Sequence, residues 1–159
     1  MKTKPGQESS AVRARLLDAA VRLFAEQGVA GTTVAQIAAP AGVTSAMVHY
    51  YFKTKDQLLD AVVAEKLVGE FIAFVADAIE RDASDPLAQA ERLVWRIVEA
   101  SDAMPWLPPL WVREVISEGG ALREKLIRRV DLGKPERFKA GIAAAQKAGR
   151  VNAGINPQL

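Results

Sequence analysis

The chain has 159 residues, of which 50% are hydrophobic and 25% are charged, and this balance allows a globular protein to bury a core. It contains no cysteine and one histidine, which excludes disulfides, thiolate metal sites and a histidine-rich metal site. The sequence has no apolar run long enough to span a bilayer. We therefore expect a cytoplasmic protein without a metal, a cofactor or a membrane partner.

The net charge of +2 is unevenly distributed along the chain. Residues 1–55 carry seven basic and three acidic side chains, whereas the remaining residues carry 14 basic and 16 acidic ones. A basic end on a slightly acidic body suits a polyanionic partner at that end. Differences of this size are common in small domains, so the asymmetry supports such a partner only weakly.

A polar N-terminal arm is expected over residues 1–9, followed by a first helix from about Ser10 to Gln27. Ser9 or Ser10 can cap its start, and Gly28 stands where helices commonly end. Apolar side chains recur in this segment every three or four residues, as an amphipathic helix requires. They are Val12, Leu16, Ala19, Ala20, Leu23 and Phe24.

A second, shorter helix is predicted to begin next to Thr33. The segment Thr33–Gln36 fits a capping box, in which a hydroxyl and a Gln side chain satisfy free backbone N–H groups. Pro40 should end this helix, because the residue before a proline disfavours helical angles. Gly42 suits the turn that follows, since glycine adopts a left-handed conformation at low cost.

A third helix is expected from a cap at Thr44 or Ser45 to about Tyr51. Val48 and Phe52 are four residues apart and can anchor one of its faces in the core. Two short helices joined by a tight glycine turn form a helix-turn-helix, which places its second helix in the DNA major groove.

The side chains around this third helix predict a DNA contact. Small residues let the backbone approach base edges, a methionine can touch thymine methyl groups, and the aromatic residues can donate hydrogen bonds to phosphates. A lysine at the start of the next helix adds its charge to the helix dipole. The DNA-binding candidates are Thr33, Thr44, Ser45, Ala46, Met47, His49, Tyr50, Tyr51, Lys53 and Lys55.

The remainder of the chain is also predicted to be helical. Thr54–Gln57 is a second capping box, opening a helix expected to continue towards residue 80, with a break at Gly69. A loop is predicted at 81–86, in which Asp85 caps the next helix and Pro86 takes its first helical position. Further helices are predicted at Leu87–Ala103, Leu110–Ser117, Ala121–Val130 and Pro135–Ala148, with a proline-rich turn at 104–109. Gly149 should end the last of them, and Asn156–Pro157 should begin a new one.

Residues 10–60 resemble the TetR family of bacterial transcriptional regulators. The resemblance is carried by Arg13, Leu16–Ala20, Leu23–Phe24, Gly28, Thr32–Val34, Ile37–Ala38, Ala41–Thr44 and Tyr50–Leu59. It implies an all-α fold, with a three-helix helix-turn-helix DNA-binding domain at 10–60 and a helical ligand-binding and dimerisation domain at 61–159. It also implies double-stranded DNA, as a palindromic operator, and a homodimer that reads it.

The chain departs from the family pattern at four positions. His49 stands where the family usually has tyrosine, and Tyr51 where it often has histidine. Ala46 replaces a common glycine, and Pro40 replaces a helical residue. These departures alter the expected contacts with DNA.

The resemblance implies that the helical body binds a small molecule. Large aromatic side chains suit an apolar or aromatic ligand, although aromatic residues at helical spacing form a core more often than a pocket. The ligand-binding candidates are Phe71, Phe74, Trp95, Met104, Trp106 and Trp111.

Family members usually dimerise through two long helices after a turn like that at Gly149, and this chain ends at Leu159 where the first would begin. We therefore expect a truncated regulatory domain and impaired dimerisation. The favoured function is a repressor released by its ligand. The alternative is a helical ligand-binding or protein-interaction module that has lost operator binding. An enzyme is not expected, because the sequence offers no nucleophile–base pair and no phosphate-binding glycine loop.

Overall fold

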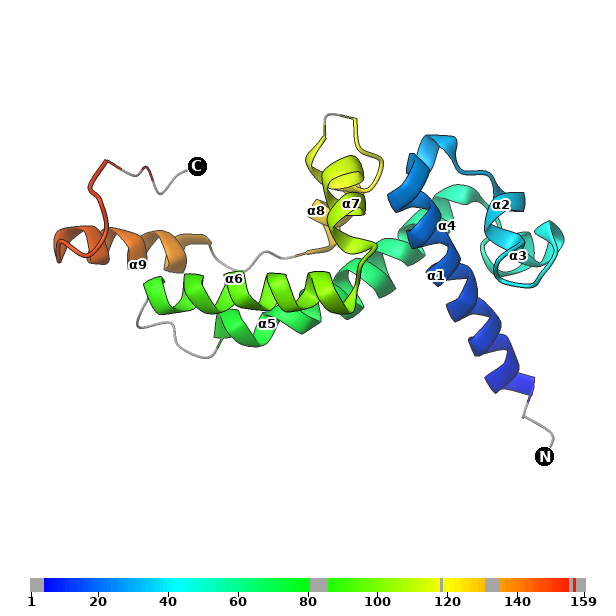
Figure 1. Cartoon of the computed structure of the whole chain (residues 1–159), viewed down its shortest axis with the longest axis horizontal. Coiled ribbons are helices and arrows are strands. Elements are labelled where there is room, and N and C mark those ends of the chain that lie inside the picture. Colours follow the sequence, from blue (N-terminus) through cyan, green and yellow to red (C-terminus); the bar gives the residue numbers. More distant parts are fainter. Residues whose placement is uncertain (1–4, 81–85, 118, 131–134, 155, 157–159) are drawn as a thin grey trace.

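Helices account for all the regular secondary structure in the computed structural model, which describes residues 5–80, 86–117, 119–130, 135–154 and 156. The all-α prediction is therefore confirmed for these residues. Four N-terminal helices gather at one end of the molecule, and two longer helical segments extend away from it side by side (Figure 1). Among the described residues, no helix combines the length and apolar character that crossing a bilayer requires.

The first helix, α1, spans Pro5–Gly31 and begins about five residues earlier than the sequence predicts. Proline is well suited to the first turn of a helix, where its missing N–H has no partner to lose. Ser9 and Ser10 therefore lie inside the helix, and the prediction that one of them caps it is wrong. Gly28 interrupts α1 near its end with a φ of 79°, a left-handed value that favours glycine.

Three short helices follow α1: α2 (Val34–Ala38), α3 (Ser45–Tyr51) and α4 (Lys55–Ala61). The helix α2 packs against α1, and α3 packs against α2. Their apolar faces meet in one core, as the periodicity predicts. Its fully buried members include Leu16, Leu17, Val21, Phe24, Ile37, Val48 and Leu58. We call the segment Pro5–Ala61 the head of the molecule.

A long helical rod leaves the head at α4. It continues through η1 (Val62–Ile72), which has π-helical hydrogen bonding, into α5 (Ala73–Glu80). The predicted break at Gly69 is wrong, because this residue lies within η1. A Cβ atom at Gly69 would lie 3.2 Å from the carbonyl oxygen of Ala64, so glycine fits the wide turn of this segment.

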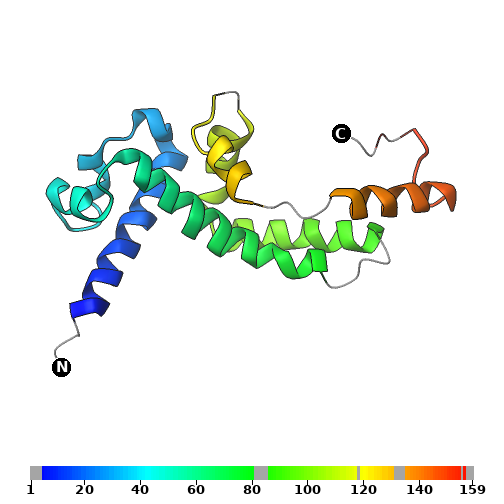
Figure 2. The ribbon, with the colours of Figure 1, turned by 180° about the vertical axis from the view of Figure 1, so that it is seen from behind.

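The helix α6 (Pro86–Ala103) runs back along α5 (Figure 2) and begins at proline as expected. It is followed by α7 (Leu107–Trp111) and η2 (Val112–Ile116), which together form one continuous helical segment. The predicted turn at 104–109 is thus too long, since Pro108 and Pro109 occupy the first turn of α7. This segment packs against α1 of the head.

Two further helices complete the described chain: α8 (Arg123–Arg129) and α9 (Pro135–Lys147). Gly149 follows α9 with a φ of 70°, in agreement with its predicted role as a terminator. Residues 81–85 of the predicted loop lie outside the described residues. The helix predicted to start at Asn156–Pro157 also lies outside them, apart from Asn156 itself.

Candidate nucleic-acid interface and ligand groove

The helix-turn-helix is built from local hydrogen bonds, which begin at the start of α2. Gln36 Oε1 accepts the Thr33 backbone N–H at 2.8 Å, and Thr33 Oγ1 accepts the Gln36 N–H at 3.3 Å, which confirms the capping box. The turn then places Gly42 at a φ of 69°, the conformation that the sequence assigns to it. These features fix where α3 begins relative to α2.

The helix α3 is anchored in the head by one face. Thr44 Oγ1 caps its start by accepting the N–H of Met47 at 3.4 Å. Val48 and Phe52 are buried in the core, as predicted. The opposite face is open, and Tyr50 has 70% of its surface exposed, whereas Met47 has 37% exposed. Side chains on that face are therefore available to a partner.

The remaining candidates on α3 differ in their surroundings. Ala46 and His49 are exposed, whereas Ser45 and Tyr51 are partly buried. The ring of Tyr51 lies edge-on to Tyr50, with centroids 5.3 Å apart, and it packs against the core. Tyr51 therefore contributes more to support of the helix than to its outer surface.

Two cationic or titratable groups lie at the C-terminal end of α3. Lys53 is exposed, and its Nζ lies 5.6 Å from the centre of the Tyr50 ring. The Nδ1 atom of His49 lies 3.4 Å from the carbonyl oxygen of Lys53. A proton on Nδ1 completes this hydrogen bond, and the outer ring nitrogen Nε2 then remains available to a partner.

Lys55 has a structural role that the sequence does not reveal. Its Nζ donates hydrogen bonds to the backbone carbonyl oxygens of Val29, at 2.6 Å, and Thr32, at 2.7 Å. The ammonium group thus closes the C-terminal end of α1, where unpaired carbonyls favour a cation. The predicted phosphate contact of Lys55 remains a prediction, and two of its three N–H donors already have partners.

Thr54 confirms only part of the second predicted capping box. Its Oγ1 accepts the N–H of Gln57 at 3.1 Å and caps α4.

Thr33 is exposed at the start of α2. Its hydroxyl group caps this helix and is also accessible to a partner.

Some of the basic charge of the head is neutralised within the protein. Arg13 pairs with Glu65 and lies over the ring of Phe52, with 5.1 Å between the guanidinium carbon and the ring centre. Lys66 of η1 binds Asp18 at 2.6 Å and also pairs with Glu70. Burial would lower the pKa of Lys66, but the hydrogen bonds and charges of the two carboxylates outweigh it and raise this pKa. The Arg13 pair neutralises one basic charge of the head and the Lys66 pair neutralises one acidic charge, so these two pairs leave the charge asymmetry of the sequence unchanged.

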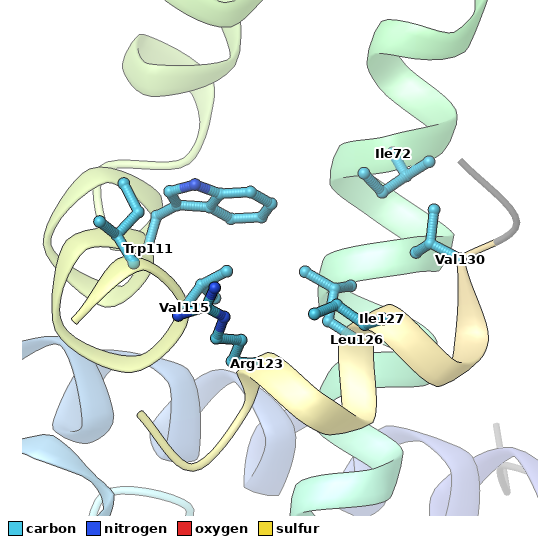
Figure 3. Close-up of a pocket in the computed structure, with 8 residues that line it drawn as sticks. Ile72, Trp111, Val115, Arg123, Leu126, Ile127 and Val130 are labelled. Carbon is cyan, nitrogen blue, oxygen red and sulfur yellow. The ribbon is translucent and has the colours of Figure 1, made fainter. Parts of the chain in front are cut away.

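The helices that follow the head, from η1 to α9, form what we call the body, and it contains an open apolar groove of about 320 Å³. Figure 3 shows Trp111 and Val115 on one side, and Leu126 and Ile127 of α8 together with Ile72 of η1 on the other. The other residues that line the groove are Ile116, Arg123 and Val130. Such a lining suits an apolar ligand, with the guanidinium group of Arg123 as its cation.

The structure does not gather the six predicted ligand-binding residues around one cavity in the part of the chain that it describes. Only Trp111 lines the groove, and Phe71 is buried behind it with ring centroids 5.2 Å apart. Phe74 is covered by the guanidinium group of Arg96, which lies 4.0 Å from the ring centre. Trp95 is 62% exposed on α6.

The other two candidates, Met104 and Trp106, are partly buried against the core and do not line the groove. Large aromatic side chains do not indicate the position of this groove, because its walls are mainly aliphatic. Leu126, Ile127 and Val130 form an amphipathic pattern that indicates an apolar helix face. This pattern does not distinguish a pocket wall from a core face.

Comparison with known proteins decides the family. Residues 16–62, which cover most of the head, match the family model of bacterial regulatory proteins of the tetR family. The chain therefore contains the N-terminal domain of the tetR family. This family consists of transcriptional regulators, which supports the expectation that the chain is not an enzyme.

Curated relatives of this tetR-family chain are similar mainly over its N-terminal part. It is 32% identical over 106 residues to the HTH-type transcriptional regulator AcrR of Shigella flexneri, covering 64% of this chain and 46% of the relative. It is 36% identical over 94 residues to the transcriptional repressor KstR2 of Rhodococcus jostii, covering 57% and 44%. The chain thus spans about half the length of these relatives.

Solved structures share the fold over most of the tetR-family chain. The hemolysin II transcriptional regulator HlyIIR superimposes with a TM-score of 0.73 and 25% identity, covering 94% of this chain and 80% of the other. FadR from Bacillus subtilis, solved in complex with stearoyl-CoA, gives a TM-score of 0.65 at 21% identity and covers 91% and 76%. These likenesses support a helix-turn-helix head followed by a helical body.

Proposed function

We propose that this tetR-family chain is a sequence-specific DNA-binding regulator that inserts α3 into the major groove. The observation that carries the proposal is the division of α3 into two faces. Val48 and Phe52 are buried, whereas Ala46, Met47 and Tyr50 are exposed on a helix with a well-formed cap and turn. A recognition helix needs this division, because one face must be held rigidly while the other meets base edges.

The exposed residues have distinct proposed roles. The short side chain of Ala46 allows close approach to base edges, and Met47 touches thymine methyl groups. Tyr50 and Lys53 lie together at the end of α3 and contact phosphates, which position the helix without reading sequence.

We further propose that the body of this cytoplasmic regulator binds a small apolar ligand in the groove beside Trp111 and that ligand releases the DNA. The apolar lining of the groove supports the ligand class. Among the relatives, KstR2 is named a repressor, and FadR was solved with stearoyl-CoA. A palindromic operator and a homodimer that reads it complete the proposal, by analogy with the family.

The test is selection of bound fragments from random genomic duplexes at physiological salt, followed by fluorescence anisotropy on the recovered sequence. Recovery of one sequence, bound with an affinity that falls steeply with salt, supports the proposal because phosphate contacts release counterions. Met47→Ala should weaken this binding, while Arg128→Ala, on the exposed surface of α8, serves as the matched control. Recovery of no preferred sequence by the folded chain would reject the proposal.

A second candidate function is a helical ligand-binding or protein-interaction module without operator binding. The engagement of Lys55 with the end of α1 favours it, since a lysine expected to hold a phosphate is already hydrogen-bonded. The same selection experiment decides between the two functions.

A further inference from the structure

The two helical segments that form opposite walls of the groove also bind the head. Trp111 and Val115 line one wall and belong to α7 and η2, and Leu126 and Ile127 line the other and belong to α8 (Figure 3). Charged side chains of both walls reach the head, and the two considered first are Glu114 of η2 and Lys125 of α8. A ligand between the walls can therefore act on the head through these two residues.

The first connection is made by Glu114, which lies in η2 beside Val115. Its side chain is buried, and its Oε1 accepts the backbone N–H of Val29, in the last turns of α1, at 2.8 Å. Its Oε2 accepts the N–H of Ala121 at 3.0 Å. A carboxylate is well suited to this position, because a single side chain must accept two backbone donors from different segments.

Glu114 also lies where the two walls meet. The N–H of Leu122 donates to the carbonyl oxygen of Glu114 at 3.2 Å. A Cβ atom at Gly120 would lie only 2.4 Å from the same oxygen, so the backbone there has no spare room. A change in the separation of the walls is therefore transmitted to Glu114, since close-packed backbone cannot absorb it.

The second connection is made by Lys125 of α8. Its Nζ binds Asp56 at 2.7 Å and Asp60 at 2.9 Å, and both of these residues belong to α4. Arg129 adds a hydrogen bond of 3.0 Å to the backbone carbonyl oxygen of Asp60. The α8 wall is thus joined to the first helix after the recognition helix.

The two connections end close together in the head. Glu114 holds the N–H of Val29, while Lys55 holds the carbonyl oxygen of the same residue. Lys55 is the neighbour of Asp56, to which Lys125 is bound. One polar chain therefore runs from the first wall through the end of α1 to the start of α4 and on to the second wall.

We infer that Glu114 and Lys125 are positioning residues that couple the occupancy of the groove to the placement of α1 and α4, and through them of α3. This inference rests on the proposed ligand groove, but it specifies residues and hydrogen bonds that the proposed function does not require. A ligand alters the separation of the walls, the Glu114–Val29 hydrogen bond weakens, and the head changes position relative to the body.

The direct test is amide hydrogen exchange of the full chain with and without 1-anilinonaphthalene-8-sulfonate, an apolar fluorescent anion suited to a groove that contains Arg123. Occupancy is followed by the fluorescence of the probe. Probe binding should speed exchange at Val29 and Ala121 by roughly tenfold, because each N–H loses a charged acceptor. Glu114→Gln offers one carbonyl oxygen instead of two carboxylate oxygens. In this variant the probe should increase the exchange rates at Val29 and Ala121 by a much smaller factor.

Substitutions can fill the groove independently of the probe. Val115→Trp, or Ile127→Trp if the first variant does not fold, places a bulky ring between the walls. Val112→Trp is the matched control, because Val112 lies on the same segment as Val115, is 58% exposed and does not line the groove. The groove-filling variant should speed exchange at Val29, and the control should not.

A second readout separates coupling from a merely structural role. Probe and DNA should change each other's affinity by one common factor, since coupling between sites is reciprocal. Glu114→Gln and Lys125→Met should bring this common factor towards one. Lys125→Arg should leave the factor closer to its wild-type value than Lys125→Met does. A purely structural role would weaken DNA binding equally with and without the probe.

The possible failures are distinguishable. If the chain binds no DNA, the proposed function fails, while hydrogen exchange still measures coupling between the groove and Val29. If the bound probe and the groove-filling variant both leave exchange at Val29 unchanged, the inference is overturned whether or not DNA binds. An unchanged coupling factor in both Glu114→Gln and Lys125→Met would overturn it as well.

Discussion

Lys55 Nζ donates a hydrogen bond of 2.6 Å to the carbonyl oxygen of Val29, and this bond joins the start of α4 to the end of α1. The two residues lie 26 positions apart in the sequence, and the helix-turn-helix is the segment between them. The contact therefore closes the head around its recognition helix. The regular part of α1 is interrupted at Gly28, and Lys55 provides a donor for carbonyl groups after this interruption that would otherwise be unpaired.

Loss of this contact should destabilise the head. Lys55→Met leaves the carbonyl oxygens of Val29 and Thr32 without their charged donor, in a partly buried site. We expect the free energy of unfolding to fall by about 1–3 kcal/mol, measured by urea denaturation. Lys53→Met is the control, because Lys53 is exposed, and it should change stability by less than about 0.5 kcal/mol. Equal effects of the two substitutions would show that the contact has no structural role.

Substitutions on the outer face of α3 should separate base recognition from phosphate binding. Met47→Ala should reduce discrimination between the preferred duplex and single-base variants of it. Each mismatched base pair normally costs about 1–3 kcal/mol of binding free energy. Lys53→Ala should weaken binding to all sequences alike and reduce the salt slope by about one. Anisotropy titrations at several salt concentrations measure both effects. Uniform weakening by both variants would contradict the assignment of Met47 to the bases.

The features of the head that follow from local sequence could be predicted. The cap at Thr33, the turn at Gly42 and the cap at Thr44 each depend on residues within four positions of one another. Val48 and Phe52 were identified as anchors because helical periodicity alone places them on one face. Local hydrogen bonding and periodicity therefore account for most of the candidate DNA-binding surface.

The contacts between distant segments could not be predicted in this way. Glu114 and Val29 are 85 positions apart, and nothing in the pattern around Glu114 distinguishes it from a solvated acid. The sequence predicts a phosphate contact for Lys55, since the carbonyl groups that it binds belong to a helix end whose position depends on the tertiary fold. Residue type alone predicts a pocket position for Trp95, but the packing of α6 leaves this side chain exposed.

Two glycines should respond differently to the same substitution. At Gly42 an added Cβ has open space but a left-handed backbone, so Gly42→Ala should cost about 1–2 kcal/mol. At Gly120 the added Cβ would lie 2.4 Å from the carbonyl oxygen of Glu114, so the backbone itself must shift. We expect Gly120→Ala to be the more destabilising variant in thermal and urea unfolding. A smaller loss for Gly120→Ala would indicate that the meeting point of the groove walls is more adaptable than its geometry suggests.

The bond between α8 and α4 should depend on alkaline pH. Hydrogen bonds to Asp56 and Asp60 raise the pKa of Lys125 above its ordinary value. A raised pKa in the folded state means that the interaction stabilises the protein fully below the ordinary lysine pKa of about 10.4 and is lost as the pH rises through the folded value. The stability difference between wild type and Lys125→Met should therefore be constant near neutral pH and shrink as the pH rises through the raised pKa of Lys125.

Lys125→Arg provides the matched control for this pH dependence. Its guanidinium group stays charged at pH values where lysine has lost its proton, so a pair with Asp56 and Asp60 would persist where that of lysine is lost. Urea unfolding of the three proteins across the alkaline range measures the effect. A difference between wild type and Lys125→Met that stays the same at every pH would mean that Lys125 stabilises the chain through its aliphatic stem and not through its charge.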